Sequence, residues 1–243
     1  MKSLAIAALN LLLACTLDAA VIRGTVVEHQ TGKFLVRALV EVQPIAGTRG
    51  SAVSVRTNVA GLFEFSSLVP GTYVVKVSRL GFMPVEYGQK RWNSAGLPLS
   101  VDDSAPAFLT IRMPRWGAVS GTVVDENDIG LPEHEVVAYR NTRPPQVAAR
   151  AKSDERGVYR ISGLEPGTYI VRTAGAQYDE GAFLPTFGKE SIPVENARQV
   201  DVDLDQQANN IDVRPFPGKL FSVSGGVIAN PPGTPTKVTI ATE

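Results

Sequence analysis

The sequence predicts an all-β protein built from repeated domains. Short runs rich in Val, Ile, Thr, Tyr and Phe are separated by turn residues, with 22 glycines and 17 prolines among 243 residues. Beyond the N-terminal segment, no stretch places apolar residues at helical spacing over a convincing length. Long segments also recur at a fixed distance along the chain, which indicates tandem domains.

The repeat is clearest at the start and in the middle of each copy. The segment 22–28, IRGTVVE, returns at 119–125 as VSGTVVD. The segment 61–77, GLFEFSSLVPGTYVVKV, returns at 157–173 as GVYRISGLEPGTYIVRT. A third start appears near Val223 and resembles the beginning of the other two. We therefore expect an N-terminal segment at 1–20, domains at 21–115 and 116–217, and the incomplete start of a third domain at 218–243.

Alternation along the middle segment predicts which side chains are buried. Phe63 and Phe65 share one face of their strand, and Glu64 lies on the other. Tyr159 and Ile161 take the same places in the second copy. These residues should point into the cores of their domains.

Glycines and prolines recur at the same places in both copies. Asn58 and Gly61 bound a predicted type I turn, and Pro70-Gly71 predicts a type II turn in which Gly71 has a positive φ. Gly24 and Gly121 lie inside first strands, where glycine indicates a bulge or a close approach of two backbones. We interpret all of these residues as structural.

The N-terminal segment has the pattern of a secretory signal peptide. Lys2 precedes an apolar stretch from Leu4 to Ala14, and small residues follow at Ala19 and Ala20. Two processing routes remain open: plain cleavage near Ala19, or cleavage ahead of Cys15, which follows a lipobox-like Leu-Leu-Ala and would then be lipidated. Cys15 is the one cysteine in the sequence, so the exported chain has no partner for a disulfide.

The composition argues against nucleic acid as a partner, and the residues offer no catalytic site. Lys+Arg and Asp+Glu both number 24, so there is no basic field for a phosphate backbone. The two histidines, His29 and His134, stand at non-equivalent positions and do not form a metal-ligand pattern. No serine has evident His and Asp companions. We expect no enzyme activity, no cofactor and no metal.

The repeated motifs resemble the carboxypeptidase regulatory-like domain. The order of IRGTVV, GKFLVRALVEV and the segment ending at Phe82 in the first copy is matched by VSGTVVD, GLPEHEVVAY and the segment 153–173 in the second. The resemblance implies a seven-stranded, transthyretin-like (prealbumin-like) Greek-key β-sandwich for each copy. It also implies a binding, spacer or folding-support module of cell-surface proteins, located in the periplasm, at the outer membrane or outside the cell.

Partners implied by the resemblance are other cell-surface proteins or adjacent domains of a longer chain. A carbohydrate-binding module with a starch-binding-like fold is the alternative, because Tyr87 and Trp92 lie in a polar connection and could stack on a polysaccharide. An accessory region of a larger surface enzyme or outer-membrane receptor is a second alternative. Contact with a membrane would come only through a lipid on Cys15.

Export is directly testable. We expect mass spectrometry of the native protein to show that the N-terminal segment has been removed, either near Ala19 or ahead of a lipidated Cys15. The two routes differ by the mass of the lipid and of the residues between the sites. A native chain that still begins with Met1 would contradict export.

Overall fold

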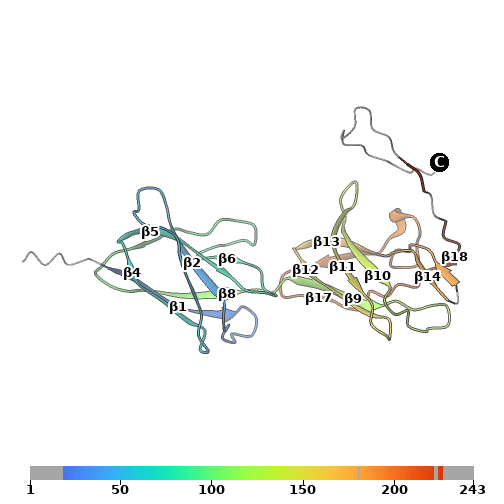
Figure 1. Cartoon of the computed structure of the whole chain (residues 1–243), viewed down its shortest axis with the longest axis horizontal. Coiled ribbons are helices and arrows are strands. Elements are labelled where there is room, and N and C mark those ends of the chain that lie inside the picture. The colour runs from blue at the N-terminus through green and yellow to red at the C-terminus, as the bar shows by residue number, and fades with distance from the viewer. Residues whose placement is uncertain (1–18, 180, 222–223, 227–243) are drawn as a thin grey trace, which may run out of the picture. The chain divides into compact units, whose positions relative to one another are not determined.

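The structure is a computed structural model that describes residues 19–179, 181–221 and 224–226 (Figure 1). The chain forms two compact units, one built mainly from residues up to Ala118 and the other mainly from Val119 onward. Regular structure in the described part consists of strands and one 3-10 turn, η1 (Val194–Asn196). The all-β prediction is therefore confirmed.

The first domain is a sandwich of two sheets. Its strands are β1 (Ala20–Glu28), β2 (Leu39–Pro44), β3 (Val53–Arg56), β4 (Leu62–Leu68), β5 (Gly71–Ser78), β6 (Val85–Glu86), β7 (Leu99–Val101) and β8 (Ala107–Met113). One sheet has the order β4-β1-β8, and the other has the order β3-β2-β5-β6 with β7 also on β5. β1 runs antiparallel to β4 and parallel to β8, so the first strand of the domain pairs with its last.

The second domain repeats this arrangement with additions. Its strands are β9 (Gly117–Thr122), β10 (Glu135–Arg140), β11 (Gln146–Lys152), β12 (Val158–Leu164), β13 (Gly167–Thr173), β14 (Ala176–Tyr178), β15 (Gly181–Phe183), β16 (Gln199–Val202), β17 (Gln207–Ala208) and β18 (Pro217–Gly218). The sheets have the orders β12-β9-β17 and β11-β10-β13-β16, and a small third sheet has the order β14-β15-β18.

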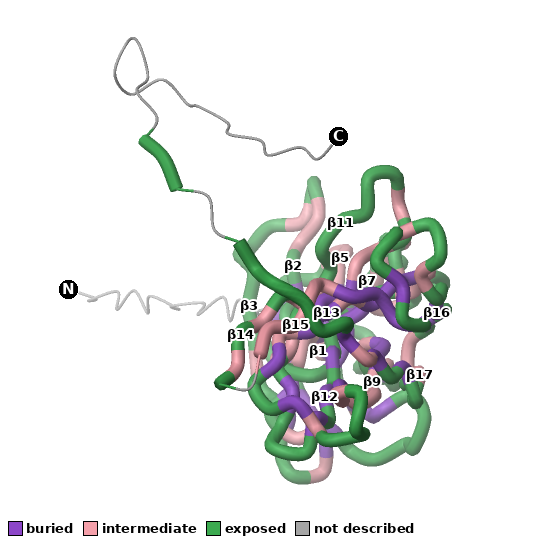
Figure 2. The backbone as a smooth tube through the Cα atoms, turned by 90° about the vertical axis from the view of Figure 1, so that its right-hand side faces the viewer, coloured by how far each residue is buried: buried purple, intermediate pink, exposed green. Residues whose placement is uncertain are grey.

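The predicted core residues are buried. Phe63 and Phe65 are 5% and 6% exposed and meet edge to face, with ring centroids 6.1 Å apart. Tyr159 and Ile161 are buried at the same places in the second domain. Burial is concentrated on the strands, whereas the turns are exposed (Figure 2). Because the sequence has one cysteine, no disulfide can form within the chain, and these apolar cores supply its stability.

Gly24 and Gly121 allow two backbones to approach closely, as the sequence predicts. A Cβ atom on Gly24 would lie 2.4 Å from the carbonyl oxygen of Leu109 and 2.6 Å from the ring of Phe63. A Cβ atom on Gly121 would meet the carbonyl oxygen of Ile211 in the same way. Both clashes are with atoms that have no room to move, so only glycine fits.

The two predicted turns have different outcomes. Gly61 adopts a φ of +69° and its N–H is donated to the carbonyl of Asn58, which confirms the turn. The prediction for Gly71 is wrong, since its φ is not positive. The side chain of Thr48 packs against Gly71, where a Cβ atom would lie 2.4 Å from the threonine methyl group. Glycine is required there for space and not for its left-handed conformation.

The predicted start of a third domain, 218–243, lies mostly outside the described residues, as does the predicted signal segment.

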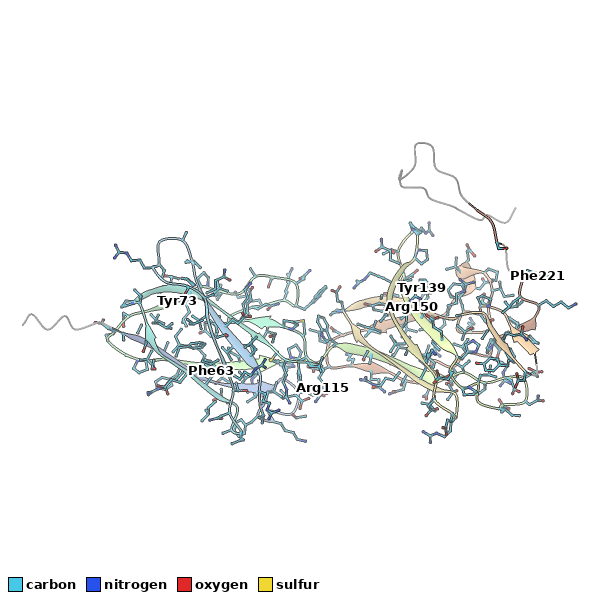
Figure 3. The ribbon with its side chains drawn as sticks, in the orientation of Figure 1. Phe63, Tyr73, Arg115, Tyr139, Arg150 and Phe221 are labelled. Atoms are coloured by element: carbon cyan, nitrogen blue, oxygen red, sulfur yellow. The ribbon has the colours of Figure 1, made fainter. Side chains whose placement is uncertain are left out.

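Loss of one core aromatic should unfold one domain. We expect Phe63→Ala to destabilise the first domain by about 3–5 kcal/mol, because it removes a buried ring and leaves a cavity (Figure 3). Calorimetry should show the first domain's transition lowered or lost and the second domain's transition retained. Val59→Ala, at a position 85% exposed, is the matched control and should leave both transitions in place. Loss of both transitions in Phe63→Ala would contradict separate cores.

Candidate functional site

The predicted stacking residues Tyr87 and Trp92 lie in the connection that follows β6 in the first domain. Both side chains are half-buried and pack against the core cluster of this domain. One part of each side chain therefore supports the sandwich, and the remainder is accessible. Whether these rings bind a ligand stays a prediction.

The connection around Trp92 is held by its own polar side chains. The side-chain amide of Gln89 donates to the carbonyls of Arg91 and Trp92, each at 2.8 Å, and its oxygen accepts the N–H of Glu86 at 2.9 Å. The carboxylate of Glu86 accepts the N–H of Gly96 at 2.8 Å. That hydrogen bond, with a smaller contribution from a nearby lysine, lowers the pKa of Glu86. The connection is thus folded in advance of any contact.

A buried carboxylate lies at the end of β1. Glu28 is 6% exposed and accepts hydrogen bonds from the Thr31 hydroxyl and from Nε of Arg115, both at 2.5 Å. The hydrogen bond from Thr31 is the largest cause that lowers the pKa of Glu28, and Arg115 adds to it. The guanidinium of Arg115, a residue labelled in Figure 3, also lies 4.5 Å from the ring centroid of Phe82. These contacts fasten the segment after β8 to the first domain.

His134 is the centre of a buried aromatic cluster in the second domain. It is fully buried, and its ring stacks on that of Tyr178 at a centroid distance of 5.8 Å and an interplanar angle of 15°. Phe183 meets both rings edge to face. The cluster joins β10 to the small sheet that contains β14 and β15. This role of His134 could not be predicted from the sequence, because its partners Tyr178 and Phe183 are far away in the chain.

Hydrogen bonds fix the state of the His134 ring. Nε2 lies 3.0 Å from the carbonyl oxygen of Ala174, which can only accept, so Nε2 carries a hydrogen. Nδ1 lies 2.9 Å from the hydroxyl of Tyr178, whose one hydrogen is shared between Nδ1 and the carbonyl oxygen of Pro132, 2.9 Å away. Burial lowers the pKa of His134, and the hydrogen bond to Ala174 opposes that shift in part. The ring is therefore neutral in the folded domain near pH 7.

The acidic loop after β9 has a structural explanation. One carboxylate oxygen of Asp125 accepts the N–H groups of Asn127 and Ile129, at 2.9 and 2.8 Å, and so closes its own turn. In the described residues, no three His, Cys, Asp or Glu side chains gather in a way that could hold a metal ion. Cys15, the predicted lipidation site, lies outside these residues. The described part also contains no helix that is long and apolar enough to cross a membrane.

Comparison with known families identifies the fold. The carboxypeptidase regulatory-like domain matches the chain twice, over residues 21–113 and 118–214. The chain belongs to this family. The resemblance seen in the sequence motifs is therefore confirmed, and both described sandwiches are carboxypeptidase regulatory-like domains. No curated protein matches the chain.

Several solved structures are similar in fold at low identity. The TIE protein of Bacillus anthracis is 17% identical with a TM-score of 0.36, and the match covers 81% of this chain and 34% of that one. The minor pilin of Streptococcus agalactiae is 14% identical with a TM-score of 0.43, covering 85% and 99%. The shaft pilin SpaA of Lactobacillus rhamnosus GG is 10% identical with a TM-score of 0.45, covering 84% and 100%. The chain thus spans about a third of the length of the first of these proteins.

The state of His134 predicts a pH dependence. Its pKa is lower in the folded domain than in the unfolded chain, where a histidine titrates near 6.5. The unfolded chain therefore binds a proton more readily, and the second domain should lose stability as the pH falls below about 6.5. We expect His134→Gln to flatten this dependence in thermal unfolding between pH 7 and pH 5.

Ile129→Ala, at a position 62% exposed in the second domain, supplies the control for this experiment. It should leave the pH dependence of the second domain's transition as in the parent protein. An unchanged pH dependence in His134→Gln would show that His134 is not the responsible group.

Proposed function

We propose that this chain is an exported, non-catalytic structural and interaction module, located at a cell surface or in the periplasm. What supports the proposal is the presence of two carboxypeptidase regulatory-like domains in tandem, each with a buried core of its own. The partners would be other surface proteins or further domains of a longer chain. A role as an accessory region of a surface enzyme or an outer-membrane receptor is compatible with the same construction.

The buried polar side chains support a structural role because they serve the backbone. Thr57 donates its hydroxyl to the carbonyl of Leu35 at 2.5 Å and accepts the N–H of Ala38 at 2.9 Å. Ser153, at the same place in the second domain, makes the same two kinds of bond. Both hydroxyls satisfy loop backbone groups that would otherwise be buried without partners. Both copies of the repeat thus keep a buried hydroxyl that forms hydrogen bonds with the backbone of the same loop.

Binding of carbohydrate is the second candidate function. It is favoured by the connection that carries Tyr87 and Trp92, which Gln89 and Glu86 hold in a fixed shape. A binding loop that is ordered beforehand loses less conformational entropy when a ligand arrives. The accessible part of the Trp92 ring would then stack on a sugar face.

A glycan array separates the two functions. We expect the parent protein to bind no immobilised glycan more strongly than a Trp92→Ala variant does, because the Trp92 ring already packs against the core. Phe34→Ala, which removes an aromatic ring 58% exposed elsewhere in the first domain, is the matched control. Specific retention that is lost in Trp92→Ala and kept in Phe34→Ala would overturn the structural proposal in favour of carbohydrate binding.

A further inference from the structure

The first domain has an open sheet edge at β8. One edge of β8 pairs with β1, from Ala107 opposite Ile22 to Met113 opposite Glu28. In the part of the chain that the structure describes, no strand pairs with the other edge. The strand is seven residues long and contains neither proline nor lysine, two residues that commonly protect such edges. It is a template on which a further strand could form.

Alternate residues of β8 face this open edge. In a strand, the backbone N–H and C=O of one residue point to one side and those of the next residue point to the other. The carbonyl of Leu109 points toward Gly24 of β1. Phe108, Thr110 and Arg112 therefore direct their backbone groups to the open edge, and all three side chains are exposed.

Two of these side chains have no partner in their own domain. Phe108 is 75% exposed, and no ring or cation contact is recorded for it among the described residues. Arg112 is exposed and forms no ion pair within the same part of the chain. An exposed aromatic ring and an unpaired guanidinium on one open strand are features of a contact surface.

The corresponding edge of the second domain is blocked against the addition of a strand. Asn210 occupies the position of Phe108, and its φ of +58° breaks the strand. Its carbonyl accepts a hydrogen bond from the guanidinium of Arg198 at 2.9 Å. Two residues on, the carboxylate of Asp212 folds back to accept the N–H of Thr122. The same fold thus occurs twice in the chain, once with this edge capped and once with it open.

The long edge strand of the second domain, β11, carries protective features that β8 lacks. Its pairing with β10 contains a register shift beside Tyr139, which is the mark of a bulge. Arg150, labelled in Figure 3, and Lys152 lie on β11. They are already paired with Glu135 and Glu133, respectively. Bulges and charges both discourage the addition of a strand.

We propose that β8 pairs antiparallel with β8 of a second copy of this chain, about a two-fold axis at Thr110. The pairing would join two three-stranded sheets into one continuous sheet. This dimer rests on the proposed function as an interaction module and specifies its partner, a second copy of the same chain. The contact would be isologous, since the same surface is used by both copies.

The sequence of β8 is complementary to itself in this register. Thr110 lies opposite Thr110 of the second copy, and Phe108 lies opposite Arg112. Each of these pairs can exchange main-chain hydrogen bonds, because all of their backbone groups face the edge. Each guanidinium then lies against an aromatic ring, which is a favourable cross-strand pair. On the inner face, Leu109 lies opposite Ile111, so apolar residues meet apolar residues.

Other registers are less favourable. An axis at Arg112 would place two guanidinium groups opposite each other, and like charges in direct opposition destabilise a sheet. An axis at Phe108 would leave both Arg112 side chains without a ring. Among the axes along β8, only the axis at Thr110 places Phe108 directly opposite Arg112, and the pattern of β8 therefore favours it.

Sedimentation equilibrium of the exported chain should show a dimer that dissociates on dilution. We expect Phe108→Lys to weaken the dimer about tenfold or more, because it places a lysine opposite Arg112. Combining Phe108→Lys with Arg112→Glu should restore the dimer, since the opposed charges then attract. Leu62→Lys, at a 48% exposed position on the same face of the sheet but on β4, is the matched control and should not affect association.

A cysteine placed at the two-fold axis tests the register directly through disulfide formation between the two copies. Thr110→Cys should form a covalent dimer when oxidised glutathione accepts two electrons from the two thiols, because the opposed Cα atoms would lie about 5.5 Å apart. Arg112→Cys should not, since its opposite residue is Phe108. The protein should be prepared without the signal segment, so that Cys15 does not contribute.

Three results would overturn the proposal. One is a chain that stays monomeric at millimolar concentration. Another is a dimer that Phe108→Lys leaves unchanged, which would use a different surface. The third is capture of an unrelated extended peptide at β8 by a chain that does not associate with itself. None of these results bears on the glycan array, so the proposed module function could survive them.

Discussion

Each domain depends on the close approach of a late segment to its first strand, and this late segment is β8 in the first domain and the residues that follow β17 in the second. In the first domain this approach brings the carbonyl of Leu109 so near to Gly24 that a single added carbon would not fit. The second domain has the same contact between Ile211 and Gly121. The inner face of the sheet is assembled around this point, because Phe63 also packs against Gly24. Without this contact, β1 would have a partner strand on one side only, and the core aromatic rings would lose part of the surface against which they pack.

The fold could be predicted from the sequence because its determinants are local and occur twice. Alternation identified Phe63, Phe65, Tyr159 and Ile161 as core residues, and the glycines of the first strands signalled a close approach. Gly71 was misread because its neighbour in space, Thr48, cannot be seen in a turn motif. The turn motif identified a position that requires glycine but gave the wrong backbone conformation, because the requirement comes from a side chain distant in the sequence.

The candidate sites were harder to predict, because they depend on contacts between distant residues. Glu28 and Arg115 are 87 positions apart, and His134 and Tyr178 are 44 positions apart. Each pair meets only after the sandwich has formed. Glu28 ends the repeated segment 22–28, but nothing in that segment points to Arg115 as its partner. Tyr87 and Trp92 were singled out by their composition and location, and the structure shows that part of each ring already supports the core. Their role as a ligand platform stays a prediction, as does the processing of Cys15.

The pairing of the first strand with the last also governs when a domain can fold. β1 cannot complete its sheet until β8 has been made, so nearly the whole domain must be present before its most distant contacts form. Closing a loop of this length is entropically unfavourable, and folds rich in such contacts fold slowly. The first domain therefore cannot close its sandwich before Met113, the last residue of β8, has been synthesised. For the export proposed above, that delay would leave the chain without a complete sheet during passage through a narrow channel.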